Sequence, residues 1–122
     1  MKTPIELAEI ADRALEEKKA DNISVLEITD LTVMADYFVI CTGSSNTHLK
    51  TLCDAVEEAL ENAGEKLDHV EGRGGGTWVL MDFGCVVVHL FTQDMRAHYD
   101  LERVWQDAKK IKIEGLGDQL GR

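Results

Sequence analysis

The stretch TWVLMDFGCVVVHLF, residues 77–91, constrains the fold more than any other part of the chain. It holds two apolar runs separated by Asp-Phe-Gly at 82–84. Glycine adopts the positive φ of a tight turn and aspartate can hydrogen-bond the turn backbone, so the pattern predicts an antiparallel hairpin with strands at about 77–82 and 85–91. A strand with one wet face alternates apolar and polar residues, and these strands do not. Both faces of the hairpin therefore need cover, from the chain itself or from a partner.

The rest of the chain carries signals for helices and further strands. Thr3 to Glu6 form a capping box with proline at the first helical position. The stretch Gly-Ser-Ser-Asn at 43–46 breaks one strand and supplies an N-cap to the next helix. The expected elements are a helix at 4–19, strands at 23–28 and 35–43, a helix at 45–63, a short strand at 66–72, the hairpin, and helical segments within 92–108. This order predicts an α/β domain with a single mixed β-sheet of about five strands flanked by helices.

Length and composition predict one domain in the cytoplasm. A chain of 122 residues fits a single domain, expected at 1–108, and the last fourteen residues, 109–122, contain three lysines and three glycines and are expected to form a flexible tail. No apolar run reaches the roughly 18 residues of a membrane span, and no secretory signal is visible at the N-terminus. The three cysteines are an odd number without CxxC spacing, which favours reduced core thiols and hence the cytoplasm.

The charge balance limits the partners. Thirteen Lys and Arg against 23 Asp and Glu give a formal net charge of −10. Direct binding to nucleic acid normally uses stripes of Lys and Arg on the phosphate backbone, so this class of function is disfavoured. Two interpretations remain open: the acidic surface serves solubility, or it speeds the encounter with a basic partner.

The strand–turn–helix passage at Gly43, Ser44 and Ser45 is the best candidate for chemistry. Such a passage can bind an anion at the helix N-terminus, and nucleotidyltransferases have a Gly-Ser turn at this place. They also need two or three carboxylates on nearby strands to hold Mg²⁺. Asp68 and Glu71 are three residues apart, which places them on opposite faces of a strand. The sequence therefore predicts that the metal site is missing, with a nucleotide-handling enzyme kept as the alternative.

Other polar residues carry weaker signals. The four histidines, at 48, 69, 89 and 98, lack metal-ligand spacing, so a hydrogen-bonded or surface histidine is the expectation for each. Arg73 lies in a glycine-rich loop at 72–76, where contact with a partner or a phosphate competes with a plain mobile loop.

The hairpin also predicts a docking surface. Trp78 and Leu80 would point to one face, and Val79 and Met81 to the other. Three helices cannot easily cover both faces of five strands, so we expect apolar surface near Trp78 to face a partner. Core packing is the alternative for this residue, because large aromatics are favoured in cores and as interface anchors alike.

Several segments together resemble the Iojap-like ribosomal silencing factor family, RsfS. The resemblance runs from about residue 4 to 108, and one departure is Thr47, where the family often has Arg or Gln. The segments that carry it are ADYFVICTGSSNTH (35–48), EG (71–72), WVLMDFGCVVVHLF (78–91) and RAHYDLERVW (96–105).

The resemblance implies a nucleotidyltransferase-like fold without the enzyme's carboxylates, hence no catalysis, no cofactor and no metal. It implies binding to the large ribosomal subunit through large-subunit ribosomal protein fourteen, which blocks subunit joining and represses translation when nutrients are short. It also implies a role in large-subunit assembly for relatives, and self-association as a dimer. No membrane and no direct sequence-specific nucleic acid is expected as a partner. Carried over by motif position, the partner surface comprises Trp78, Leu80, Asp82, Tyr99, Leu101 and Glu102.

Overall fold

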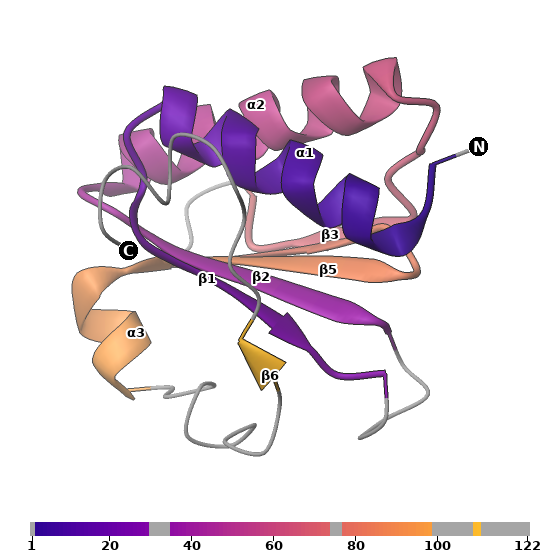
Figure 1. The fold of residues 1–122 in the computed structure, drawn as a ribbon. Helices are drawn as coiled ribbons and strands as arrows, with labels where there is room; N and C mark the ends of the chain where they lie inside the picture. Colours follow the sequence, from indigo (N-terminus) through magenta and orange to yellow (C-terminus); the bar gives the residue numbers. More distant parts are fainter. Residues whose placement is uncertain (1, 30–34, 74–76, 99–108, 111–122) are drawn as a thin grey trace.

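Two long helices lie side by side across one face of the β-sheet in the computed structural model (Figure 1). The structure describes residues 2–29, 35–73, 77–98 and 109–110. The helices are α1 (Pro4–Glu17) and α2 (Asn46–Asn62). A third, short helix, α3 (Gln93–His98), directly follows the strand β5 (Val86–Thr92). It contacts β5 and the neighbouring strand β2 (Tyr37–Gly43).

Local capping chemistry starts both long helices where the sequence predicts. The Thr3 hydroxyl accepts a hydrogen bond from the Glu6 backbone N–H, and the Glu6 carboxylate accepts one from the Thr3 backbone N–H at 2.9 Å. This capping box satisfies donors that a helix end otherwise leaves unpaired. The N-cap of α2 is Ser45, which lies within the stretch 43–46 that the sequence indicates, and its hydroxyl accepts from the backbone N–H of His48 at 3.1 Å.

The described strands form one mixed sheet, which confirms the predicted fold class. Their order is β3-β4-β5-β2-β1-β6, with β2 and β5 parallel and every other neighbouring pair antiparallel. The five expected strands are all present, and a two-residue strand, β6, is added at one edge. The strands are β1 (Asp21–Glu27), β2 (Tyr37–Gly43), β3 (His69–Glu71), β4 (Trp78–Asp82), β5 (Val86–Thr92) and β6 (Lys109–Lys110).

The predicted hairpin is β4 and β5, which pair antiparallel with Leu80 opposite His89. Gly84 has φ +88° in the turn, and the Asp82 carboxylate accepts the Gly84 backbone N–H at 2.7 Å. Both turn roles that the sequence assigns to these two residues are therefore confirmed.

The hairpin register divides the sheet residues between two faces. The helix-covered face packs on α1 and α2, and its strand residues are almost all fully buried. The other side, called the second face below, has a separate cluster that is buried in the middle and partly exposed at Trp78, Leu80 and Met95. On the helix-covered face lie Ile23, Val25, Val39, Cys41, Val79, Met81, Val86, Val88 and Leu90. On the second face lie Leu26, Phe38, Ile40, Val87 and Phe91.

Three further findings concern the domain boundary, the cysteines and membrane-spanning helices. Lys109 and Lys110 pair with Glu27 and Leu26 of β1, so the sheet extends two residues past the expected domain boundary at 108. The single domain at 1–108 and the flexible tail remain predictions, because residues 111–122 lie outside the described part.

Cys41 and Cys53 are buried and Cys85 is half-buried, and all three are free thiols, as expected. Within the described residues, no helix is long and apolar enough to span a membrane.

Candidate partner-binding face

Three of the six predicted partner residues lie on one strand and share one face. Trp78, Leu80 and Asp82 alternate along β4, with Trp78 opposite Phe91 and Leu80 opposite His89. All three are partly exposed, while the intervening Val79 and Met81 are 1% and 0% exposed. The structure thus brings these side chains together on the second face, as the alternation predicts.

The other three predicted partner residues follow α3 in the chain. Tyr99, Leu101 and Glu102 lie outside the described residues, so their membership of the surface stays a prediction.

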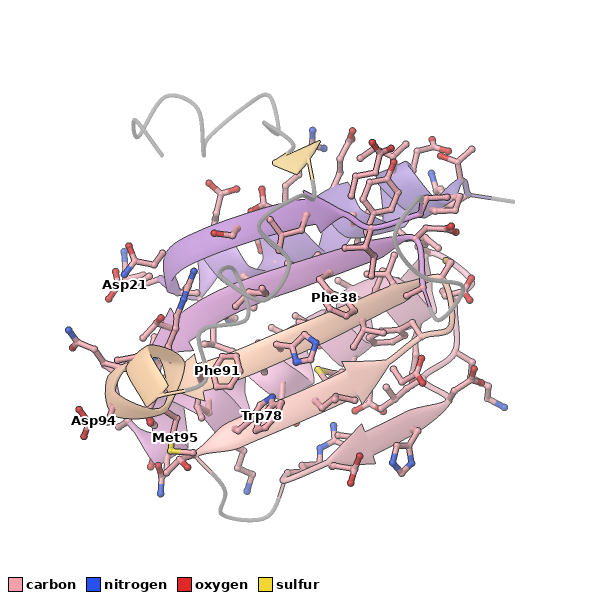
Figure 2. The ribbon with its side chains drawn as sticks, turned by 90° about the horizontal axis from the view of Figure 1, so that it is seen from below. Asp21, Phe38, Trp78, Phe91, Asp94 and Met95 are labelled. Atoms are coloured by element: carbon pink, nitrogen blue, oxygen red, sulfur yellow. The ribbon has the colours of Figure 1, made fainter. Side chains whose placement is uncertain are left out.

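The Trp78 indole is held in place by two contacts from β5. Its ring stacks on Phe91 with centroids 5.1 Å apart and an interplanar angle of 30°. Its Nε1–H donates a hydrogen bond to His89 Nδ1 at 3.2 Å. Figure 2, which views the sheet from the side away from α1 and α2, shows Trp78, Phe91 and Met95 at the same end of this face. Trp78 is therefore neither sealed in the core nor loose at the surface.

His89 is the functional candidate that sequence reasoning missed. It is only 5% exposed and lies edge-on to Phe38, with ring centroids 4.9 Å apart. Burial lowers its pKa to about 4, so the ring is neutral at pH 7. Because Nδ1 accepts from Trp78, the proton of the neutral ring is on Nε2. That buried atom has no hydrogen-bond partner within the described structure.

A signal for this placement was present in the sequence. The run VVVHLF puts His89 two residues from Val87 and Phe91, and in a strand those positions share a face. A histidine inside an otherwise apolar row is buried unless its face is open. The position therefore indicated a buried ring, although the bond to Trp78 depends on the register of the hairpin.

Acidic side chains border the apolar part of the second face. Glu71 of β3 lies opposite Leu80 and its side chain is 67% exposed, and Asp82 follows Leu80 on β4. Asp94 is exposed in the first turn of α3, beside Met95. His69 lies within this border, with its Nε2 3.3 Å from the Glu71 carboxylate. The surface around Trp78 is therefore apolar in the middle and negative at its edge.

Arg96 fastens α3 to the end of the sheet. Its guanidinium donates to the carbonyl of Asn22, to Thr42 Oγ1 at 3.1 Å and to Ser24 Oγ at 3.3 Å. These partners belong to β1 and β2, more than fifty positions earlier in the chain. The contacts fix the helix that presents Met95 next to Trp78.

The serine turn is occupied by the chain's own side chains. The Ser44 backbone N–H donates to His48 Nδ1 at 2.9 Å, so His48 carries its proton on Nε2 and donates to the carbonyl of Lys18 at 2.7 Å. The His48 ring therefore links the start of α2 to the end of α1. An anion at this turn would need the backbone donors that His48 and the Ser45 hydroxyl already use.

The carboxylates also fail to fit a metal-dependent enzyme. Glu71 lies on the second face, whereas Asp68 precedes β3 and its carboxylate lies near Gly84 in the hairpin turn. Across the described ranges, no three His, Cys, Asp or Glu side chains are placed to hold a metal ion. The donor set that Mg²⁺ needs in a nucleotidyltransferase is not assembled by these residues.

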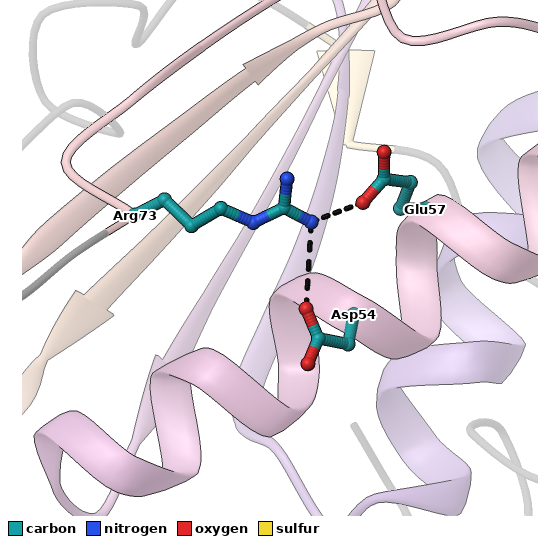
Figure 3. A network of polar contacts seen from close by, with 3 residues as sticks. All are labelled: Asp54, Glu57 and Arg73. Carbon is teal, nitrogen blue, oxygen red and sulfur yellow. Dashed lines mark hydrogen bonds and ion pairs between the residues drawn. The ribbon is translucent and has the colours of Figure 1, made fainter.

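Arg73 binds within the molecule. Its guanidinium contacts the carboxylates of Asp54, at 3.4 Å, and Glu57, both on α2 (Figure 3). The hydrogen bond to Glu57 raises the pKa of Arg73. The preceding Gly72 has φ +81°, and a Cβ there would lie 2.1 Å from the carbonyl oxygen of Trp78. The backbone of Gly72, at the start of the glycine loop, therefore packs directly against the backbone of Trp78.

By its fold the protein is a small α/β domain built on one open mixed sheet. The family model described as "ribosomal silencing factor during starvation" (RsfS) matches residues 1–121, and the chain belongs to this family.

Individual relatives agree with this assignment. The chain is 35% identical over 111 residues to ribosomal silencing factor RsfS of Halalkalibacterium halodurans, which covers 91% of this chain and 95% of that protein. It is 30% identical to mitochondrial assembly of ribosomal large subunit protein 1 of Mus musculus, over 88% of this chain and 46% of that protein. A crystal structure of a protein from Chromobacterium violaceum superposes with a TM-score of 0.84 at 33% identity, covering 93% of this chain and 94% of the other.

Proposed function

We propose that this protein binds the large ribosomal subunit, sterically blocks subunit joining and so represses translation. The observation that carries the proposal is the half-buried Trp78, held by His89 and Phe91 at the open side of an apolar face with an acidic border. Membership of the RsfS family supplies the ribosome as the partner. Steric blocking needs no catalytic group, because two bodies cannot occupy one surface.

The subunit contact is proposed to be large-subunit ribosomal protein fourteen. Ribosomal proteins are typically basic, so the border of Glu71, Asp82 and Asp94 would attract one while exposed RNA repels a chain of net charge −10. The contact residues are Trp78, Leu80 and Asp82, joined by Tyr99, Leu101 and Glu102. A standard interface buries roughly 800 Å² per partner, and burying a tryptophan such as Trp78 contributes about 2 kcal/mol or more at a hot spot.

Sedimentation with isolated large subunits tests this proposal. The wild-type protein should pellet with the subunits at moderate salt, and Trp78→Ala and Asp82→Arg should stay largely in the supernatant. Glu61→Arg is the matched control, because it makes the same charge change at an exposed position of α2 on the helix-covered side. A wild-type protein that remains in the supernatant contradicts ribosome binding. Variants that pellet as well as the wild type contradict this surface.

Assembly of the large subunit is a second candidate function, favoured by the name of the mouse relative. It uses the same surface and the same partner. Sucrose gradients from cells depleted of the protein separate the two: an assembly role predicts precursors of the large subunit, whereas silencing predicts normal subunits that join too readily.

A nucleotide-handling enzyme has less support. The Ser44 backbone N–H at the turn already donates to His48, and no three His, Cys, Asp or Glu side chains in the described part of the chain are placed to hold a metal ion. A thermal scan with ATP or CTP and Mg²⁺ tests it: stabilisation by several degrees that is lost on changing Asp68 and Glu71 would favour the enzyme. We further propose that the protein is cytoplasmic. We also propose that it self-associates as a dimer, and light scattering after size-exclusion chromatography measures the molar mass that tests this.

A further inference from the structure

We propose that His89 is a positioning residue for docking, which sets the orientation of the Trp78 indole on the second face. The ribosome-binding part of this inference rests on the proposed function, while the orientation itself is testable on the free protein. His89 is not expected to touch the partner, because it is 5% exposed.

The geometry of the hairpin gives His89 this role. Trp78 lies directly opposite Phe91, and His89 is the diagonal neighbour on the same face. Stacking on Phe91 restrains the plane of the indole, but a half-turn about χ2 would leave the ring roughly in that plane with its N–H on the other edge. The hydrogen bond from Nε1 to His89 Nδ1, at 3.2 Å, selects one of these two orientations.

His89 is itself held firmly enough to act as a reference. Its ring lies edge-on to Phe38 at 4.9 Å between centroids and parallel to Phe91, with an interplanar angle of 6° and 6.1 Å between centroids. Burial keeps the ring neutral at physiological pH, so one of its nitrogens lacks a proton, and the hydrogen bond from Trp78 makes Nδ1 that nitrogen. The acceptor is therefore fixed in position and in protonation state.

Packing alone does not account for a histidine at this position. The residues directly opposite on the two neighbouring strands are Ile40 and Leu80, both apolar. Nε2–H is buried without a partner in the described structure, and such a donor destabilises the fold. A leucine would fill the site without that cost. The feature that leucine lacks is the acceptor for Trp78.

Two variants separate positioning from packing. His89→Leu keeps apolar bulk and removes the acceptor, whereas His89→Asn places an amide oxygen close to the position of Nδ1 and keeps one. The chain has two tryptophans, Trp78 and Trp105. Both variants are therefore made in a Trp105→Phe background, in which Trp78 gives the single indole signal. The readouts are the indole N–H cross-peak in a ¹H–¹⁵N spectrum, its hydrogen-exchange rate, the Tm, and affinity for large subunits.

For His89→Leu we expect the indole cross-peak to shift and its exchange to accelerate, with the Tm unchanged or raised. Affinity for large subunits should fall about fivefold, the loss that one hydrogen bond of ordinary strength corresponds to. His89→Asn should restore most of the indole protection and of the affinity.

Two results would overturn the inference. One is a His89→Leu protein whose indole signal and subunit affinity both match the wild type. The other is a parallel fall of Tm and affinity in both variants, which would make His89 a packing residue only. If the wild-type protein itself fails to bind subunits, the proposed function is wrong, and the indole signal alone still decides whether His89 positions Trp78.

Discussion

The two faces of the sheet use the same strands for different purposes. On the helix-covered face, Val79 and Met81 of β4 are 1% and 0% exposed beneath α1 and α2. On the second face, Trp78, Leu80 and Asp82 of the same strand are partly exposed. The helix-covered face of β4 is therefore closed, whereas its second face leaves apolar side chains partly exposed. An unbroken apolar strand in a small protein need not mean that both of its faces are core.

The largest expected effect contrasts two leucines. Leu52 of α2 is 0% exposed in the helix-covered core, so Leu52→Ala should lower the free energy of unfolding by about 2–5 kcal/mol. Leu80→Ala, on the partly exposed part of the second face, should cost about 1 kcal/mol yet weaken subunit binding. Urea denaturation measures both. Equal losses of stability would erase the distinction between the faces.

The second effect is a dependence of the free energy of unfolding on pH that arises from His89 on the second face. The pKa of His89 is lowered from the ordinary value of 6.5 to about 4, so between these values the unfolded chain binds more protons than the folded protein. Stability present above pH 6.5 is therefore lost as the pH falls towards 4, by up to about 3 kcal/mol. His89→Leu keeps every carboxylate of the chain, so the wild-type minus variant difference isolates this histidine. A difference that does not change over this window would be inconsistent with a buried neutral ring.

A smaller effect is expected from the capping box on the helix side. Thr3→Ala removes the side-chain acceptor for the Glu6 backbone N–H and should cost about 1 kcal/mol of stability. Subunit binding should not change, because Thr3 starts a helix that packs on the opposite face. Thr47→Ala, at an exposed position in the first turn of α2, is the control for a threonine outside a cap. A binding defect in Thr3→Ala would mean that the helix side also takes part in docking.

The smallest effect concerns the tether of the glycine loop. Arg73→Gln breaks the contacts with Asp54 and Glu57 and should cost about 0.5 kcal/mol, since the partners are partly exposed and screened by water. Raising the salt concentration should shrink the wild-type advantage. A much larger loss would show that the loop supports Trp78 through more than this ion pair.

Local patterns in the sequence predict the elements well but not their neighbours. The capping box at Thr3, the N-cap at Ser45 and the Gly84 turn depend on residues within four positions, and all three are confirmed. The strands at 35–43 and 66–72 run in the same direction, as a connecting helix permits, but β4 and β5 lie between them. Strand order depends on long-range packing, which spacing in one sequence does not encode.

The candidate site shows the same division. Alternation along β4 predicts that Trp78, Leu80 and Asp82 share a face, and the structure agrees. The bond from Trp78 to His89 depends on the hairpin register, and the anchoring of α3 by Arg96 joins residues 54 and 72 positions apart. Neither contact corresponds to a repeating pattern of residues that could be recognised in the sequence.

Formation of whole ribosomes tests the central claim most directly. Purified small and large subunits are mixed in magnesium, and light scattering follows their joining with wild-type protein, with Trp78→Ala or with the Glu61→Arg control. The account predicts that wild type and control suppress joining at concentrations that saturate the large subunit, while Trp78→Ala leaves it nearly intact. Joining at the normal rate and extent with the wild type bound to the large subunit would contradict the claim that occupancy of this face is the activity.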